Sequence, residues 1–170
     1  TDSYLEETLP TDKSYTRMTH LLGRFENSAS EFYQAYRDNE EELFTTPLKH
    51  MSPITENLLR AVDYVSVKAK RTENFERLHS ELAGTNKLAL RIPDGAFSYP
   101  FLVDNGYELR KWLIENKVYI PVLWPNVTKE CAVDTVEHNL TSNLLPLPCD
   151  QRYGAVDMDR IISLIQTQKR

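Results

Sequence analysis

The chain has 170 residues, of which 41% are hydrophobic and 26% are charged, as expected for one globular domain with a buried core. Its net charge is -5 and its longest basic cluster is Lys68–Arg71, which argues against a nucleic-acid surface, and its composition suggests no membrane span. The first residues, Thr1–Tyr4, do not resemble the start of a signal peptide. We therefore expect a cytoplasmic protein in which Cys131 and Cys149 are free thiols.

The first predicted element is an amphipathic helix between Ser14 and Phe44. Its apolar residues recur at steps of three and four, which places them on one helix face. Gly23 and Asn27 weaken the prediction of an unbroken helix. The apolar stripe consists of Met18, Leu21, Leu22, Phe25, Ala29, Phe32 and Tyr36.

A second, longer helix is predicted from Ser52 to Gly84. Ser52 can cap the free N–H groups of the first turn, and Pro53 fits that turn because it needs no hydrogen-bond acceptor there. Gly84 is a natural helix terminator. The helix would be about 45 Å long at 1.5 Å per residue. A small domain cannot cover such a length, so we expect part of the helix to pack on something else.

Short apolar runs bounded by Pro, Gly, Asp or Asn follow, and they predict strands. The runs are 88–92, 99–103, 118–123 and 144–147. Helices are predicted at 107–117 and from Val156 onward. The resulting fold class is α+β, with a small antiparallel or mixed sheet flanked by helices and a long N-terminal helical arm. The predicted division is a helical N-terminal segment, 1–51, followed by a domain at 52–170.

Residue patterns that carry chemistry are scarce. The five glycines are dispersed, so no phosphate-binding loop is predicted. Cys131, His138 and Cys149 lack the paired spacing of a zinc site, and no nucleophile elbow accompanies the histidines. We therefore predict no catalytic, cofactor-binding or metal-binding residue in this chain.

Two aromatic residues are candidates for ligand binding. Tyr119 and Trp124 flank Pro121 and Pro125 at the end of a predicted strand, where a loop can face a ligand. Packing explains the same two residues equally well, and both interpretations stay open.

Five stretches in the last two thirds of the chain form a recognisable set. They are Arg71–Phe75, Tyr99–Val103 with Glu108–Leu113, Val118–Pro125, and Leu145–Gly154 leading through Asp157 and Met158 into Ile161. Together they resemble the C-terminal small domain of the DegT/DnrJ/StrS-type sugar aminotransferases, which depend on pyridoxal phosphate (PLP). The resemblance covers about positions 50 to 168.

The resemblance implies the C-terminal domain of a fold-type-I PLP transferase. In that family the lysine that forms the Schiff base lies upstream, on a large domain, and no lysine here stands in the family's Ser-x-x-Lys setting. The family's small domain lines the substrate side of the cleft, which makes Tyr119, Trp124 and Arg152 the substrate-binding candidates. For Arg152 the alternative is an ion pair with Asp150, Asp157 or Asp159.

Two hypotheses follow. In the first, the chain is part of an aminotransferase that transfers an amino group to a keto sugar nucleotide, in nucleotide-sugar or polysaccharide biosynthesis. PLP then belongs to the complete enzyme, the partner is the large PLP-binding domain or subunit, and the isolated chain is inactive. In the second, the chain is a stand-alone dimerisation or interaction module derived from that domain. We expect a homo-oligomer, a dimer, with no nucleic-acid or membrane partner.

Overall fold

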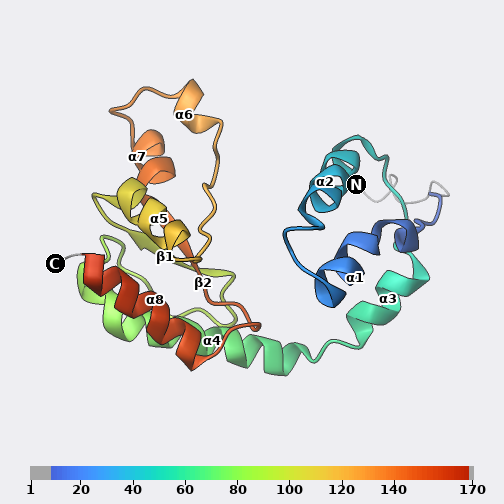
Figure 1. Cartoon of the computed structure of the whole chain (residues 1–170), viewed down its shortest axis with the longest axis horizontal. Coiled ribbons are helices and arrows are strands. Elements are labelled where there is room, and N and C mark those ends of the chain that lie inside the picture. The colour runs from blue at the N-terminus through green and yellow to red at the C-terminus, as the bar shows by residue number, and fades with distance from the viewer. Residues whose placement is uncertain (1–8, 169–170) are drawn as a thin grey trace, which may run out of the picture. The chain divides into compact units, whose positions relative to one another are not determined.

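The computed structural model describes residues 9–168, and the chain divides into two compact units between Val62 and Asp63 (Figure 1). The division differs from the predicted one, which lay between residues 51 and 52. Residues 1–8 of the predicted N-terminal segment lie outside the described residues. The helix that opens after residue 52 therefore belongs to the first unit.

Helix α3 (Pro53–Arg60) is tied to the first unit at its N-terminal end. Thr55 Oγ1 donates a hydrogen bond to Ser14 Oγ at 3.0 Å, and Ser14 also shares a hydrogen bond with Ser52. Ser52 caps α3 by accepting a hydrogen bond from the backbone N–H of Thr55 at 3.1 Å. The predicted Ser-Pro helix start is thereby confirmed.

The predicted single helix between residues 14 and 44 is wrong. The first unit instead contains a short 3-10 helix, η2 (Ser14–Arg17), followed by α1 (Thr19–Glu26) and α2 (Tyr33–Thr45). The chain turns between α1 and α2 and lays the Phe32 ring against Gly23, where any Cβ atom would collide with it. The absence of a Cβ atom at Gly23 therefore allows the turn to pack closely onto α1.

The predicted helix from Ser52 to Gly84 is also interrupted. After α3 the chain breaks at residues 61–63, and α4 begins at Tyr64 and ends at Leu82 before a short 3-10 turn, η3 (Ala83–Thr85). Asp63 caps α4, because its side chain accepts hydrogen bonds from the backbone N–H of Ser66 at 3.0 Å and from the Ser66 hydroxyl at 2.7 Å. A local side-chain cap thus starts a new helix inside a continuous helical pattern.

The second unit is built on a two-stranded antiparallel sheet. Strand β1 (Ser98–Leu102) pairs with β2 (Leu144–Pro148), with Tyr99 opposite Leu147 and Phe101 opposite Leu145. The α+β class and an antiparallel sheet are confirmed, and the strands predicted at 99–103 and 144–147 are present.

The strands predicted at 88–92 and 118–123 are wrong, because within the described chain neither segment pairs into a sheet. Residues 118–120 nevertheless alternate as a strand would, with Val118 and Ile120 buried and Tyr119 exposed. Pro121 lacks the N–H group that a ladder needs. The segment therefore lies extended over the core without a partner strand.

Helices enclose the sheet (Figure 1). Helix α4 packs against β1 and α8 (Ala155–Gln168), while α5 (Gly106–Glu115) packs against β2, α8 and α7 (Val136–Asn143). A single turn, α6 (Val127–Glu130), precedes α7, and neither α6 nor α7 is predicted by the apolar pattern. The helices predicted at 107–117 and from 156 onward are confirmed. No helix in residues 9–168 combines the length and the apolar character that crossing a membrane requires.

The buried apolar residues of the described chain all lie in the second unit. All of them except Leu102 form one cluster, to which α4, α5 and α8 contribute. The largest side chains with almost no exposed surface are Phe75, Leu78, Leu82, Tyr99, Phe101, Leu109, Leu113, Leu145, Leu147, Met158 and Ile165. This core fixes the positions of the loops around it.

Gly106 lies where two backbone segments of the second unit pack closely. A Cβ atom at Gly106 would collide with the backbone of Asn143 at the end of α7, whereas one at Gly84 would meet no atom within 4 Å. We expect Gly106→Ala to lower the free energy of unfolding by about 1–3 kcal/mol, because overpacked backbone must shift. Urea denaturation should show the loss for Gly106→Ala and none for the control Gly84→Ala. Equal midpoints for the two variants would contradict this packing.

Candidate functional site

A cleft of about 450 Å³ opens on the second unit at the ends of several elements. Its walls come from α4, from the residues that enter β1, from the extended segment after α5, and from β2 with the loop that follows it. The lining residues are Arg71, Phe97, Ser98, Tyr119, Pro121, Leu123, Pro146, Pro148, Asp150, Gln151, Arg152 and Tyr153. Two of the three predicted site residues, Tyr119 and Arg152, therefore share one cleft.

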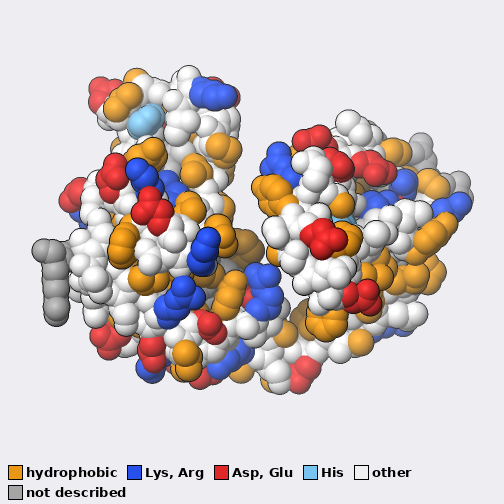
Figure 2. Space-filling view, in the orientation of Figure 1, with side chains coloured by type: hydrophobic (Ala, Val, Ile, Leu, Met, Phe, Trp, Pro, Cys, Tyr) orange, Lys and Arg blue, Asp and Glu red, His pale blue; other side chains and the backbone are white. Residues whose placement is uncertain are grey.

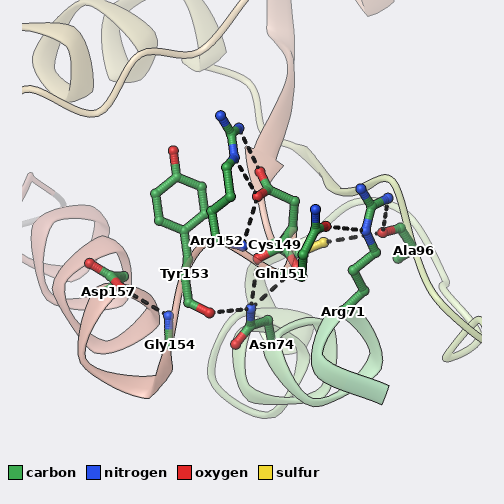
Figure 3. A network of polar contacts seen from close by, with 10 residues as sticks. Arg71, Asn74, Ala96, Cys149, Gln151, Arg152, Tyr153, Gly154 and Asp157 are labelled. Atoms are coloured by element: carbon green, nitrogen blue, oxygen red, sulfur yellow. Dashed lines mark hydrogen bonds and ion pairs between the residues drawn. The ribbon is translucent and has the colours of Figure 1, made fainter. Parts of the chain in front are cut away.

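A buried asparagine holds the loop that forms one wall of this cleft (Figure 3). The Asn74 side chain on α4 is 1% exposed, and its Nδ2 group donates to the carbonyl oxygens of Cys149, Asp150 and Tyr153 at 3.3, 3.1 and 3.0 Å. These carbonyls belong to a turn between β2 and α8, where no ladder or helix satisfies them. Asn74 thus fixes the path of the backbone on which Arg152 stands.

A second contact joins α4 to the same loop. Arg71 Nε donates to Gln151 Oε1 at 2.8 Å, and Arg71 Nη1 donates to the carbonyl oxygen of Ala96 at 3.4 Å (Figure 3). Arg71 and Asn74 stand three residues apart and therefore lie on the same helix face. Their guanidinium and amide groups hold two separate segments to α4 beside the cleft, the loop at 149–153 and the backbone at Ala96.

Arg152 is paired with Asp150 in the cleft wall. Its Nε and Nη2 groups donate to the two carboxylate oxygens at 2.8 and 3.0 Å, and its backbone N–H donates to Asp150 Oδ1 at 3.1 Å. The hydrogen bond from Arg152 lowers the pKa of Asp150 below its usual value, and the same bond raises the pKa of Arg152. Of the ion pairs considered for Arg152, the one with Asp150 is present, whereas Asp159 binds Arg77.

The Arg152 side chain is held in place without being covered. Its guanidinium lies 5.5 Å from the centre of the Tyr153 ring, and 72% of the side chain is exposed. A cation held by a carboxylate and an aromatic ring has little conformational freedom to lose when it meets a ligand. The ion pair and a ligand contact are therefore compatible.

The two aromatic candidates differ in their placement. Tyr119 lines the cleft and is 70% exposed. Trp124 is 58% exposed but does not line the cleft, whereas its neighbour Leu123 does. Trp124 also has a φ angle of 53°, in the left-handed region that bulky residues rarely adopt. Backbone strain of this kind, which costs on the order of 1 kcal/mol, is held in place by the surrounding structure.

The charges that line the cleft favour an anionic ligand. Two guanidinium groups, Arg71 and Arg152, face one carboxylate, Asp150. Cys149 lies beside the loop but is buried, and burial raises the pKa of its thiol to about 11, so it is neutral near pH 7. The cleft has the groups to bind and orient an anion, and its lining offers neither a lysine nor a histidine for proton transfer or covalent catalysis.

The described residues do not form a metal site, since they contain no group of three or more His, Cys, Asp or Glu side chains that could hold an ion.

None of the protein-family models, curated proteins or solved structures compared with the chain matches it.

The role of Asn74 in the site was not predicted from the sequence. The stretch Arg71–Phe75 belongs to the set that carries the family resemblance, yet nothing in it indicates that Asn74 binds a loop some 75 residues away. One signal was present, because Asn74 is a polar amide four residues before apolar Leu78 and therefore shares its helix face. Such an amide needs partners inside the fold.

Replacing Asn74 should loosen the cleft wall. We expect Asn74→Ala to lower the free energy of unfolding by about 1–3 kcal/mol, because three carbonyl groups lose a buried donor. Hydrogen exchange at residues 151–154 should accelerate by more than global destabilisation accounts for. Asn126→Ala is the matched control, since Asn126 is exposed and the one hydrogen bond of its side chain goes to nearby Glu130. Unchanged stability and exchange in Asn74→Ala would contradict the anchoring role.

Proposed function

We propose that the chain is the small domain of a PLP-dependent aminotransferase of the DegT/DnrJ/StrS type, which acts on keto sugar nucleotides, and that it supplies the substrate side of the active site. The observation that carries this proposal is the convergence of Tyr119 and Arg152 on one cleft. They come from separate stretches of the resemblance, Val118–Pro125 and Leu145–Gly154. A third stretch contributes Arg71, which lines the same cleft.

The chemistry of the cleft supports a nucleotide sugar as its ligand. Such a molecule carries a diphosphate, which guanidinium groups bind through directed hydrogen bonds, and a base, which aromatic rings can stack on. Arg71 and Arg152 are the guanidinium groups available for the diphosphate. The exposed rings of Tyr119 and Phe97 are available for stacking on the base. Phe97 is 81% exposed, an unusual placement for a phenylalanine with no apolar cover.

The described residues do not fit a PLP site of their own. A Schiff base needs a lysine in an enclosed pocket, and each described lysine is at least partly exposed, with none lining the cleft. In the complete enzyme PLP acts as an electron sink for the amino transfer. Under this proposal, the role of the present chain is to bind, orient and shield the sugar nucleotide.

The surface of the first unit supports a large partner domain. None of its described large apolar side chains is buried, and Phe25, Phe44 and Leu48 are 92%, 90% and 82% exposed. Hydrophobic side chains are visible over the face of this unit in Figure 2. Exposed apolar surface of this extent is typical of a segment that another polypeptide covers. The large PLP-binding domain or subunit is the partner that the resemblance implies.

The same surface favours one alternative function, a stand-alone dimerisation module in which a second copy covers the first unit. Sedimentation separates the two: the module should be a stable dimer that does not bind the dye ANS. A monomer that binds ANS through its first unit favours the missing large domain.

The isolated chain should not form an internal aldimine. We expect that mixing it with PLP and reducing the mixture with borohydride labels no single lysine, because the exposed lysines have nothing to enclose the coenzyme. Peptide mass spectrometry measures the labelling, and scattered substoichiometric adducts count as background. A stoichiometric adduct at one lysine, with turnover of a sugar nucleotide, would refute the proposal that the PLP-binding lysine lies on another domain.

The cleft residues should affect substrate binding in the complete protein. Its coding sequence upstream of Thr1 should encode a domain with a PLP-binding lysine, and an in-frame stop codon there would refute the fused arrangement. In that protein we expect Tyr119→Ala and Arg152→Ala to raise KM for the sugar nucleotide by about 10-fold, with a smaller change in kcat. Tyr64→Ala, an exposed tyrosine outside the cleft, is the matched control. Unaltered KM in both cleft variants would contradict the assignment.

A further inference from the structure

A second hollow, of about 530 Å³, lies in the second unit and is separate from the cleft in its lining residues. It is open on one side and is lined by α5, by the segment around residues 122–128 and by α7. Tyr107, Ile114, Val122 and Pro125 give it largely apolar walls. Concave apolar sites of this size with a few polar groups are typical of small-molecule binding.

Arg110 is the unusual residue of this cavity. It lines the cavity, yet it is 6% exposed and has no carboxylate partner among residues 9–168. Its Nη1 and Nη2 groups donate to the carbonyl oxygens of Ser142 at 3.1 Å and Leu144 at 2.8 Å. Its Nε atom is buried without a hydrogen-bond partner.

Those two carbonyl contacts explain only part of the arrangement. They lie at the C-terminal end of α7, where a cation is favourable, and they use two of the five N–H donors of the guanidinium group. Burial lowers the pKa of Arg110, with no neighbouring anion to oppose the effect. A buried cation without a counter-charge is costly, and a bound anion would offset that cost.

The other charges at the cavity define the charge of the ligand. Lys111 and Glu115 also line it, and their opposite charges offset each other. One positive charge, that of Arg110, therefore remains, which suits a monoanion better than a phosphate dianion. The apolar walls require that the rest of the ligand be apolar as well.

We propose that this cavity binds an organic monocarboxylate with an apolar body, whose carboxylate pairs with the free N–H groups of Arg110 while its body lies against Ile114, Val122 and Pro125. The site does not depend on the proposed aminotransferase function. It lies next to the cleft along the chain, because Tyr119, Pro121 and Leu123 line the cleft while Val122 and Pro125 line the cavity.

Calorimetric titration of the full chain with 4-phenylbutyrate tests the proposal, with the neutral 4-phenylbutyramide as the matched ligand. We expect saturable binding of one 4-phenylbutyrate per chain, and at least about 10-fold weaker binding of the amide, because the amide cannot pair with a buried cation. Absence of saturable 4-phenylbutyrate binding, or equal binding of the two ligands, would overturn the proposal.

Two variants locate the site. Val122→Trp fills the cavity and should weaken binding at least about 10-fold, whereas Val156→Trp makes the same change at an exposed position on α8 and should leave binding within about 2-fold. Arg110→Gln should weaken the binding of 4-phenylbutyrate at least about 10-fold, because the variant has no cation to pair with the carboxylate. Circular dichroism checks that the variant folds. Arg110 also holds the end of α7, so if Arg110→Gln fails to fold, the binding measured for Val122→Trp decides the outcome. Unweakened binding to folded Val122→Trp would place the ligand elsewhere and refute the proposal.

Discussion

The cleft of the second unit depends on one buried amide. Asn74 stands on α4, the longest helix in the described chain, and its side chain holds the carbonyl groups of the turn that joins β2 to α8. A local hydrogen bond from the Tyr153 N–H to the Asp150 carbonyl at 3.2 Å closes the turn, and Asn74 adds a donor from a distant part of the chain. The cleft follows from this contact, since the anchored turn presents Arg152 while Arg71 approaches from the same face of α4.

One extended segment relates the two hollows of this unit. Residues 118–125 run over the core without a partner strand and direct alternate side chains to different places. Val118 and Ile120 enter the core, Tyr119 and Leu123 line the cleft, and Val122 lines the cavity. A ligand in the cavity would thus contact the same backbone that positions the cleft's aromatic ring. This proximity supplies a physical route by which the two sites could be coupled.

The two units differ in how their apolar residues are used. The second unit buries a continuous cluster around Tyr99, Phe101 and Leu78, whereas the first unit, in its described part, holds its turns together mainly through polar contacts such as those between Ser14 and Thr55. Polar contacts of this kind contribute little net stability in water. The apolar side chains of the first unit are therefore left exposed in the described chain, and both proposed functions assign a partner to cover them.

The sequence by itself determined the α+β class, the strands around Tyr99 and Leu145, and the Ser52 helix start, because each has a local pattern. Of the three site candidates, Tyr119 and Arg152 line one cleft and Trp124 does not. The sequence did not predict the break at Asp63 or the unpaired segment at 118–123, since a cap and a missing partner strand compete with a favourable local pattern. The Asn74 anchor and the buried Arg110 charge were decided only by the tertiary structure. Both depend on contacts between residues far apart in the chain, and local periodicity carries no information about such contacts.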